Sequence, residues 1–248
     1  SLLDADKTGF TRDEADNIAS PLDTMTPKGL YWALNRASIR MGSWFSNGMK
    51  TGIKTGFDSG STLDYIYENQ PRGFGPGGRL IDRIFLSAIG WRGIRQRKLH
   101  MQEMIGVALA RLKSAGRSTH ILDIAAGHGR YVLDAIETAS DKPSSIRLQD
   151  YSPVNVTAGQ KLITERGLSE TASFHEADAF DTNGLAATTP SPYLAIVSGL
   201  YELFPDNGQI SASLAGLAKA MKPGALLLYT GQPWHPQLEM IARALTSH

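Results

Sequence analysis

The sequence predicts an α/β fold in which helices cover both faces of a mostly parallel, doubly wound sheet, with a helical extension before it. The second half of the chain alternates short apolar runs with segments of helical periodicity, the pattern of successive strand–helix–strand units. The first half shows helical spacing of its apolar residues without that alternation. We therefore expect a helical extension or cap at residues 1–116 and a sheet domain at residues 117–248.

Five apolar runs are the predicted strands, at residues 120–124, 146–148, 172–175, 194–198 and 226–230. Helices are expected between them at residues 129–138, 154–166 and 209–221, with a further helix from residue 236 to the end. In such sheets, ligands bind beyond the carboxyl ends of the strands, where the strand order reverses. The loops that follow the strands are therefore where a functional site is expected.

The composition excludes several classes of protein. The 248 residues include 25 Lys and Arg, 24 Asp and Glu, and no cysteine. This balance argues against a nucleic-acid-binding protein, which usually has a strong basic excess. No disulfide or thiolate metal site can form, and no His, Asp or Glu cluster has metal-ligand spacing, so no metal is expected. No apolar run could span a bilayer and no signal peptide opens the chain, which favours a cytoplasmic location.

The segment at residues 31–54 is aromatic and basic: Trp32, Trp44 and Phe45 stand among Lys and Arg residues, with no acid before Asp58. Its glycines would interrupt a long helix. One interpretation is a helical cap that packs on the sheet domain. The other is a peripheral membrane contact, because Lys and Arg beside Trp and Phe suit a lipid–water interface.

The last part of the extension has helical spacing, and Gly90 and Gly93 predict a break into two helices. A run of positive charge lies there, with Arg92, Arg95 and Arg97. The run is either a solvated helix face or an anion-binding edge, since guanidinium groups pair with carboxylates and phosphates. On a helix Arg92 and Arg95 share a face. We expect at least one of the three arginines to face the opening of the site.

The stretch Asp-Ile-Ala-Ala-Gly-His-Gly follows the first predicted strand and precedes a helix. Gly127 and Gly129 let the backbone turn sharply and approach a ligand, and the helix presents its positive N-terminal end there. A dinucleotide fingerprint would need a third small residue where Val132 stands. The spacing therefore disfavours an NAD(P)-dependent oxidoreductase, which stays open as an alternative, as does a non-catalytic cofactor-binding scaffold.

This stretch resembles the acid-x-Gly-x-Gly-x-Gly motif of the class I S-adenosylmethionine-dependent methyltransferases, with Asp123 as the acid and Ala125 in place of the first glycine. The resemblance implies a Rossmann-like domain that binds S-adenosyl-L-methionine at Asp123, Ala125, Gly127 and Gly129. It also implies that the loop surrounds the methionine end of the cofactor and that the acid helps to orient it.

The later loops follow the same family pattern. Asp150 ends the second strand, and an acid there can accept hydrogen bonds from both ribose hydroxyls. In the third loop, the resemblance implies that Asp178 accepts from the adenine amino group, that Ala179 offers its backbone N–H to the ring, and that Phe180 lies near the base. The predicted cofactor contacts are completed by Tyr151 and Ser198.

The resemblance covers residues 119–231 and has one departure. The family's sheet ends in a two-stranded hairpin, and too few residues follow Thr230 to form it. We therefore expect a sheet without that hairpin. Either this is a piece of a longer polypeptide, which we favour, or another chain covers the exposed edge strand. Together with the glycine loop, residues 55–67 and 78–98 resemble a bacterial group of methyltransferases, some of which are fused to an α/β-hydrolase domain.

A hydroxyl or ammonium acceptor would need a base as well as an activated methyl group. The candidates lie in the loops after the fourth and fifth strands and are Tyr201, Glu202 and His235. Each also has a plainer interpretation: Tyr201 as a pocket wall, Glu202 as the partner of an arginine, and His235 as an ordinary loop residue. The sequence predicts a methyltransferase for a small-molecule or lipid-like acceptor, and no nucleic-acid partner.

Overall fold

The computed structural model describes residues 11–204, 206–232 and 235–245, and the chain divides into two compact units. Residues Ser1–Gln96 and Gln232–His248 form the first unit, and residues Arg97–Gly231 form the second. This division differs from the one predicted at residue 116. Residues 97–116 belong with the sheet, and the C-terminal segment belongs with the helices of the first unit.

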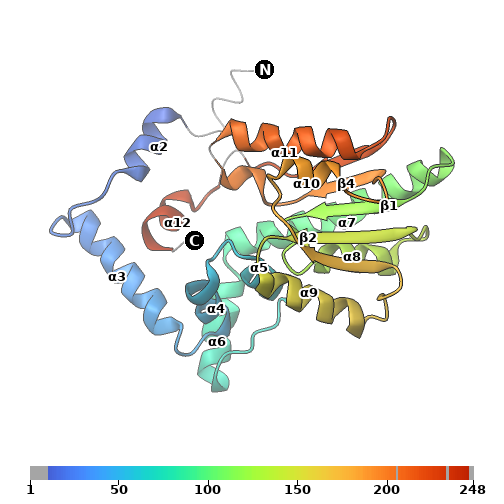
Figure 1. The fold of residues 1–248 in the computed structure, drawn as a ribbon. Helices are drawn as coiled ribbons and strands as arrows, with labels where there is room; N and C mark the ends of the chain where they lie inside the picture. The colour runs from blue at the N-terminus through green and yellow to red at the C-terminus, as the bar shows by residue number, and fades with distance from the viewer. Residues whose placement is uncertain (1–10, 205, 233–234, 246–248) are drawn as a thin grey trace. The chain divides into compact units, whose positions relative to one another are not determined.

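The second unit is built on five parallel strands, β1 (His120–Ile124), β2 (Ser145–Asp150), β3 (Ala172–Glu176), β4 (Leu194–Val197) and β5 (Leu226–Tyr229). Their order is β3-β2-β1-β4-β5, so the direction of winding reverses between β1 and β4 (Figure 1). The predicted parallel, doubly wound sheet is confirmed. Ile124 is in register with both Gln149 and Val197, which brings the carboxyl ends of β1, β2 and β4 together. Among the described residues no strand follows β5.

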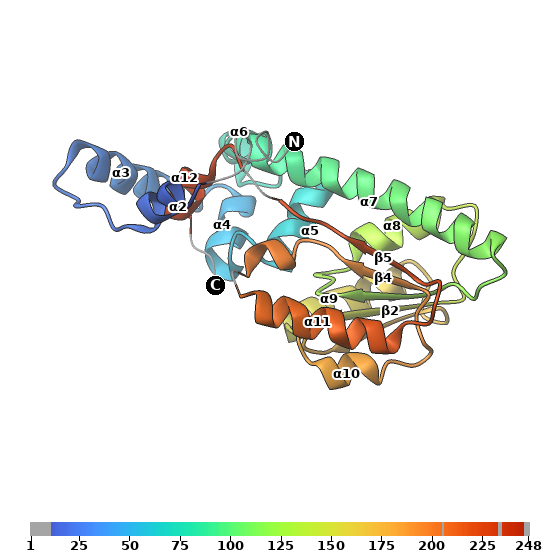
Figure 2. The ribbon, with the colours of Figure 1, turned by 90° about the horizontal axis from the view of Figure 1, so that it is seen from above.

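Helices cover both faces of this sheet. Figure 2 shows α7 and α8 on one face, and α10 and α11 on the other. The helical elements are α7 (Ile89–Ser114), α8 (Arg130–Thr138), α9 (Pro153–Glu165), α10 (Thr182–Ala186), the short 3-10 helix η1 (Tyr201–Leu203) and α11 (Asn207–Ala220). The predicted break into two helices is present, between residues 86 and 89, but its predicted position is wrong because Gly90 and Gly93 both lie inside α7. A glycine costs a helix about 1 kcal/mol, and burial of later residues such as Ile105 and Leu109 offsets that cost.

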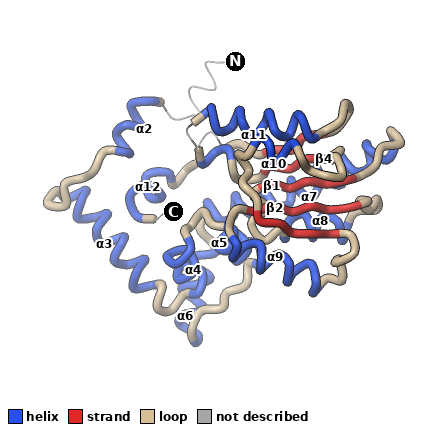
Figure 3. Tube along the Cα trace, viewed as in Figure 1, coloured by secondary structure: helices blue, strands red, loops and turns tan. Residues whose placement is uncertain are grey.

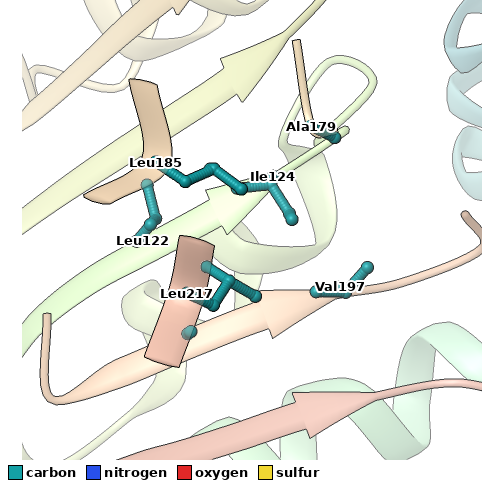
Figure 4. Close-up of a cluster of buried hydrophobic side chains, with 7 residues drawn as sticks. Leu122, Ile124, Ala179, Leu185, Val197 and Leu217 are labelled. Atoms are coloured by element: carbon teal, nitrogen blue, oxygen red, sulfur yellow. The ribbon is translucent and has the colours of Figure 1, made fainter. Parts of the chain in front are cut away.

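The strands, red in Figure 3, all belong to the second unit and are apolar because both faces are covered. Every residue of β4 is buried, as are the last four of β1. Figure 4 shows Leu185 of α10 and Leu217 of α11 beside the side chains of β1 and β4. This core fixes the ends of the strands and therefore the starting points of the loops that follow them.

The first unit contains only helices among its described elements: α2 (Arg12–Ala19), α3 (Pro27–Gly42), α4 (Asn47–Thr55), α5 (Gly60–Glu68), α6 (Gly75–Leu86), the start of α7, and α12 (Leu238–Ala244). Thr26, Ser46 and Ser59 cap α3, α4 and α5, and each accepts a backbone N–H of the turn that follows. The core of this unit includes Phe57, Ile66, Phe85 and Leu86. None of the described helices is both long and apolar enough to cross a membrane.

The aromatic and basic segment at residues 31–54 forms most of α3 and α4. Trp32 is only 8% exposed, whereas Trp44 is 78% and Phe45 is 46% exposed. Of the three aromatic residues that suggested a membrane contact, Trp44 and Phe45 are therefore at the surface, and Trp32 is in the interior.

Candidate functional site

The loop between β1 and α8 turns through left-handed backbone. The φ angles of Ala125, Gly127 and Gly129 are 55°, 61° and 73°. A residue with a Cβ costs about 1–2 kcal/mol in this conformation, so Ala125 departs from the family pattern at an energetic cost. At Gly129 a Cβ would also lie 2.3 Å from Leu148 Cδ1. Glycine there serves both the turn and its close packing on β2.

Asp150 holds this loop to the end of β2. Its Oδ2 accepts a hydrogen bond from the Gly127 N–H at 2.8 Å. Its Oδ1 accepts from the Ser152 N–H at 2.9 Å and from the Asn155 side-chain amide at 3.0 Å. A carboxylate offers about four acceptor positions. Within the described part of the chain three are filled, which leaves Oδ2 with room for one further donor rather than for two.

Asp123, at the end of β1, is fully buried. The Tyr131 hydroxyl donates to its Oδ1 at 2.7 Å, and its Oδ2 has no hydrogen-bond partner among the described residues. Burial raises the pKa of Asp123 well above its ordinary value, and the charge of Asp150 adds to that shift, while the Tyr131 bond opposes it. A buried carboxylate oxygen without a donor is destabilising. The atom is therefore suited to a cation or N–H donor that a ligand would bring.

The loop after β3 combines a tight turn with an aromatic pair. Asp178 Oδ1 accepts the Phe180 N–H at 2.9 Å, which closes the turn. Ala179 is buried, and the Phe180 ring lies edge-on to the Phe204 ring with the centroids 4.7 Å apart. Tyr151, directly after β2, is 79% exposed. These rings provide apolar surface at the carboxyl ends of β2 and β3, beside the carboxylates of Asp150 and Asp178.

Tyr201 lies in η1, after β4, and turns its hydroxyl toward a helix. Its oxygen is 2.9 Å from the hydroxyl oxygen of Ser213, which is fully buried on α11. Burial raises the pKa of Tyr201, and the Ser213 bond only partly opposes this. A general base needs a pKa near the working pH. The contacts therefore favour the interpretation of Tyr201 as a wall of the site.

Glu202, also in η1, is held by an arginine. Its Oε1 accepts from Arg97 Nη1 at 3.0 Å, while Glu202 Oε2 and Arg97 Nε are buried without a partner in the part of the chain that is described. The Thr230 hydroxyl is 3.4 Å from the same Oε1 and accepts the Gly199 N–H at 2.8 Å. A Cβ on Gly199, whose φ is 78°, would lie 2.9 Å from a guanidinium nitrogen of Arg97. The Arg97–Glu202 ion pair therefore lies against the residues that follow β4 and β5, Gly199 and Thr230.

The arginine that meets the site loops is Arg97, not the pair expected to share a face. Arg95 donates to the Leu86 C=O at 2.9 Å within the first unit, and Arg92 is exposed. Sequence reasoning did not single out Thr230. The available signal was its place at the end of β5, next to the half-buried Ser198 that follows β4.

His235 belongs to the first unit. Its Nδ1 accepts the Gln237 N–H at 3.0 Å, and burial lowers its pKa. The structure does not place it in the same compact unit as Tyr201 and Glu202, so its catalytic role stays a prediction. Among the described residues, no group of three or more His, Asp or Glu side chains is arranged to hold a metal ion.

A parallel sheet of this order, a left-handed turn after its first strand and a buried acid at the end of its second define a Rossmann-like domain, the class that binds nucleotide cofactors at the switch point. Residues 1–248 match the model of a protein family described as "Putative methyltransferase", and the chain belongs to this family. The predicted resemblance to methyltransferases is thereby confirmed.

Three known proteins are similar to this chain. YnbC of Escherichia coli strain K12 is 51% identical over 245 residues, which is 98% of this chain but 41% of YnbC, so the chain spans less than half of that relative. A crystal structure of a "possible exported protein" from Bordetella parapertussis gives a TM-score of 0.59 at 16% identity, over 90% of this chain and 88% of that one. A S-adenosylmethionine-dependent methyltransferase from Thiobacillus denitrificans, solved with S-adenosyl-L-homocysteine, gives a TM-score of 0.39 at 19% identity, over 52% and 46%. The Bordetella structure shows a shared fold, and the lower score establishes nothing further.

Proposed function

We propose that the chain is an S-adenosylmethionine-dependent methyltransferase whose cofactor lies across the carboxyl ends of β1, β2 and β3. The observation that carries this proposal is the pair of unfilled acceptor positions at the glycine loop, one on Asp123 and one on Asp150. The cofactor carries an ammonium group and ribose hydroxyls, which are the donors that these positions lack. Membership of a methyltransferase family supports the assignment.

When bound, S-adenosylmethionine would supply a methyl group on a sulfonium centre, already activated for transfer. The protein then has to bind the cofactor and the acceptor, orient them toward each other and exclude water. Asp150 holds the ribose and keeps the glycine loop at the end of β2. Asp178 and Phe180 receive the adenine, with the exposed ring of Tyr151 beside them. The buried Asp123 supports the methionine end from beneath the loop.

The acceptor, a small molecule or a lipid-like one, binds beside the loop after β4. Glu202 Oε2 is the group that can accept a proton from a hydroxyl or ammonium acceptor there, because it is buried and has no partner among the described residues. Arg97 keeps the carboxylate in place through the other oxygen. Its role is positional, since it acts on Glu202 and not on the reacting atoms.

Calorimetric titration with S-adenosylmethionine tests cofactor binding. Asp150→Ala should weaken the affinity by about 1–3 kcal/mol, the usual effect of removing the partner of a buried hydrogen-bonding group. Glu170→Ala is the matched control, because Glu170 is an exposed carboxylate in the turn before β3. NADH should not compete. Unchanged affinity in a correctly folded Asp150→Ala protein would remove Asp150 from the cofactor site.

Methyl transfer separates an enzyme from a non-catalytic scaffold. Cofactor with a labelled methyl group is incubated with the protein and a cell extract, and the labelled product is identified. Glu202→Gln keeps the shape of the side chain but accepts protons poorly. It should bind the cofactor like the parent and transfer label slowly. A parent protein that binds the cofactor and labels nothing would favour the scaffold.

A further inference from the structure

The first unit exposes aromatic side chains on two neighbouring loops. Trp44 and Phe45, directly after α3, are 78% and 46% exposed, and Phe74, directly before α6, is 81% exposed. The two loops lie side by side, because the Phe74 N–H donates to the Phe45 C=O at 2.8 Å. We call Trp44, Phe45 and Phe74 the aromatic tip.

Glycines let the two loops of the tip pack closely. A Cβ on Gly73 would lie 2.1 Å from the Gly78 carbonyl oxygen, and a Cβ on Gly78 would lie 2.6 Å from the Phe45 carbonyl oxygen. Both positions therefore need glycine, which accounts for part of the Gly-Phe-Gly-Pro-Gly-Gly sequence at residues 73–78.

A buried acid connects the same two loops. Asp82 is 0% exposed and accepts the Ser46 hydroxyl at 2.6 Å and the Gly48 N–H at 3.0 Å, both next to the first loop. It also accepts the Arg72 N–H at 2.8 Å from the second loop. The exposure of the aromatic tip is therefore a built feature of the fold, since the backbone on both sides of it is fixed from beneath.

An apolar stripe continues from the tip along α3. Leu30, Leu34 and Met41 are 55%, 60% and 54% exposed. Their spacing of four and seven residues puts them on one face of the helix. Met41 stands one turn before the aromatic tip, so the stripe ends next to the tip.

The charged residues of the two stretches that carry this surface are almost all basic. Residues 24–57 and 69–86 contain eight Lys and Arg residues and a single acid, Asp82, which is buried. All eight basic side chains are exposed: Lys28, Arg36, Arg40, Lys50, Lys54, Arg72, Arg79 and Arg83. Lys28 and Arg72 pair with acids from outside these stretches, Glu239 and Glu68.

We propose that the aromatic tip and the α3 stripe dock the protein on an anionic lipid surface. Trp and Phe side chains enter the region between head groups and acyl chains, and the surrounding Lys and Arg attract the phosphates. A second copy of the chain is the poorer occupant, because a symmetric contact would bring the same basic patches together. This docking does not depend on methyl transfer.

Flotation with vesicles tests the proposal. Vesicles of phosphatidylcholine mixed with phosphatidylglycerol should carry the protein at low salt, and added salt or phosphatidylcholine alone should reduce the bound fraction. The double variant Trp44→Ser, Phe74→Ser should lose binding, and Arg40→Glu should weaken it about tenfold or more, given about 1 kcal/mol per charge near the membrane. Tyr229→Ser is the control, because Tyr229 is a 65% exposed aromatic residue of the second unit.

Four results would overturn the proposal. The first is no flotation on anionic vesicles at low salt, and the second is equal flotation of the double variant and the parent. The third is binding to neutral vesicles that is as strong as binding to anionic vesicles and insensitive to salt. The fourth is a parent protein that is a dimer in solution and a double variant that is a monomer. The last result would assign the surface to a second copy. The substituted side chains are exposed, so circular dichroism should show that every variant folds like the parent.

Discussion

Replacement of Asp82 tests whether one buried carboxylate holds the first unit together. Four donors converge on it: Ser46 and Gly48 on Oδ1, and the Arg72 N–H and Tyr65 hydroxyl on Oδ2. Burial raises the pKa of Tyr65, and the bond to Asp82 raises it further, so the phenol stays a donor. Asp82→Ala removes all four acceptor contacts at once, whereas Tyr65→Phe removes one.

The size of the effect follows from the number of bonds. A hydrogen bond to a charged group contributes about 1.5–3 kcal/mol, so four of them set an upper bound of about 6–12 kcal/mol. Loss of the buried charge also removes its desolvation penalty, and water entering the vacated space satisfies some donors. We expect Asp82→Ala to lower the free energy of unfolding by about 3–5 kcal/mol, below that bound because these two effects offset part of the loss. Tyr65→Phe should cost about 1–2 kcal/mol.

Urea unfolding followed by tryptophan fluorescence measures both variants. Residues 97–231, which form the second unit, contain no tryptophan, so this signal reports on the first unit even when the second unfolds separately. Tyr31→Phe is the matched control, because Tyr31 is 57% exposed. If Asp82→Ala destabilised the protein no more than Tyr65→Phe, the four bonds would not act as a hub and the reasoning would be refuted.

Three further changes have defined outcomes. The pKa of Asp123 is raised above its ordinary 3.8, so the parent should lose stability as pH rises from that value through the folded-state pKa. Asp123→Asn should make the stability of the protein depend less on pH. If the parent and the variant gave parallel profiles of urea midpoint against pH, this prediction would be contradicted. Gly129→Ala combines a φ of 73° with a 2.3 Å approach to Leu148, so calorimetry should show cofactor affinity lower by about 1–3 kcal/mol. Tyr201→Phe should keep its methyl-transfer rate, because the hydroxyl is bonded to Ser213, and a loss of about a hundredfold would make it a base instead.

The sheet could be predicted closely from the sequence because a covered parallel strand is a short, continuous apolar run. The predicted first strand at residues 120–124 coincides with β1, and the predicted fourth strand at residues 194–198 is one residue longer than β4. Helix α10 was missed because its five residues are too short to show a period. The break before α7 was misplaced because helix propensity is a weak signal beside tertiary packing.

The first unit was harder to predict because its organisation depends on distant polar contacts. Ser46 lies 36 residues from Asp82 and caps another helix, α4, and no periodic pattern connects the two residues. The aromatic content of residues 31–54 was visible, but composition does not say that Trp32 faces inward while Trp44 faces outward. That distinction follows from the face on which α3 packs.

The same limit applies to the candidate site. Asp150 could be chosen from its place at a strand end, but not the three donors that already occupy it. Arg97 and Glu202 are 105 residues apart, and their pairing depends on where η1 lies beside α7. The sequence predicted that at least one of Arg92, Arg95 and Arg97 faces the site, and helix geometry alone, which puts Arg92 and Arg95 on one face, did not say which one. Arg97 is the arginine that lies at the site because it pairs with Glu202 of η1.

The proposed cofactor site and the proposed lipid-docking surface use different residues, so variants of each can be used to test the class of acceptor. Asp150→Ala should lose cofactor affinity and still float with anionic vesicles. The double variant of Trp44 and Phe74 should lose flotation and still bind the cofactor. If the acceptor is lipid-like, both variants should fail to label vesicles that contain it, because docking concentrates the enzyme where the acceptor is. If it is a small water-soluble molecule, only Asp150→Ala should fail to label it.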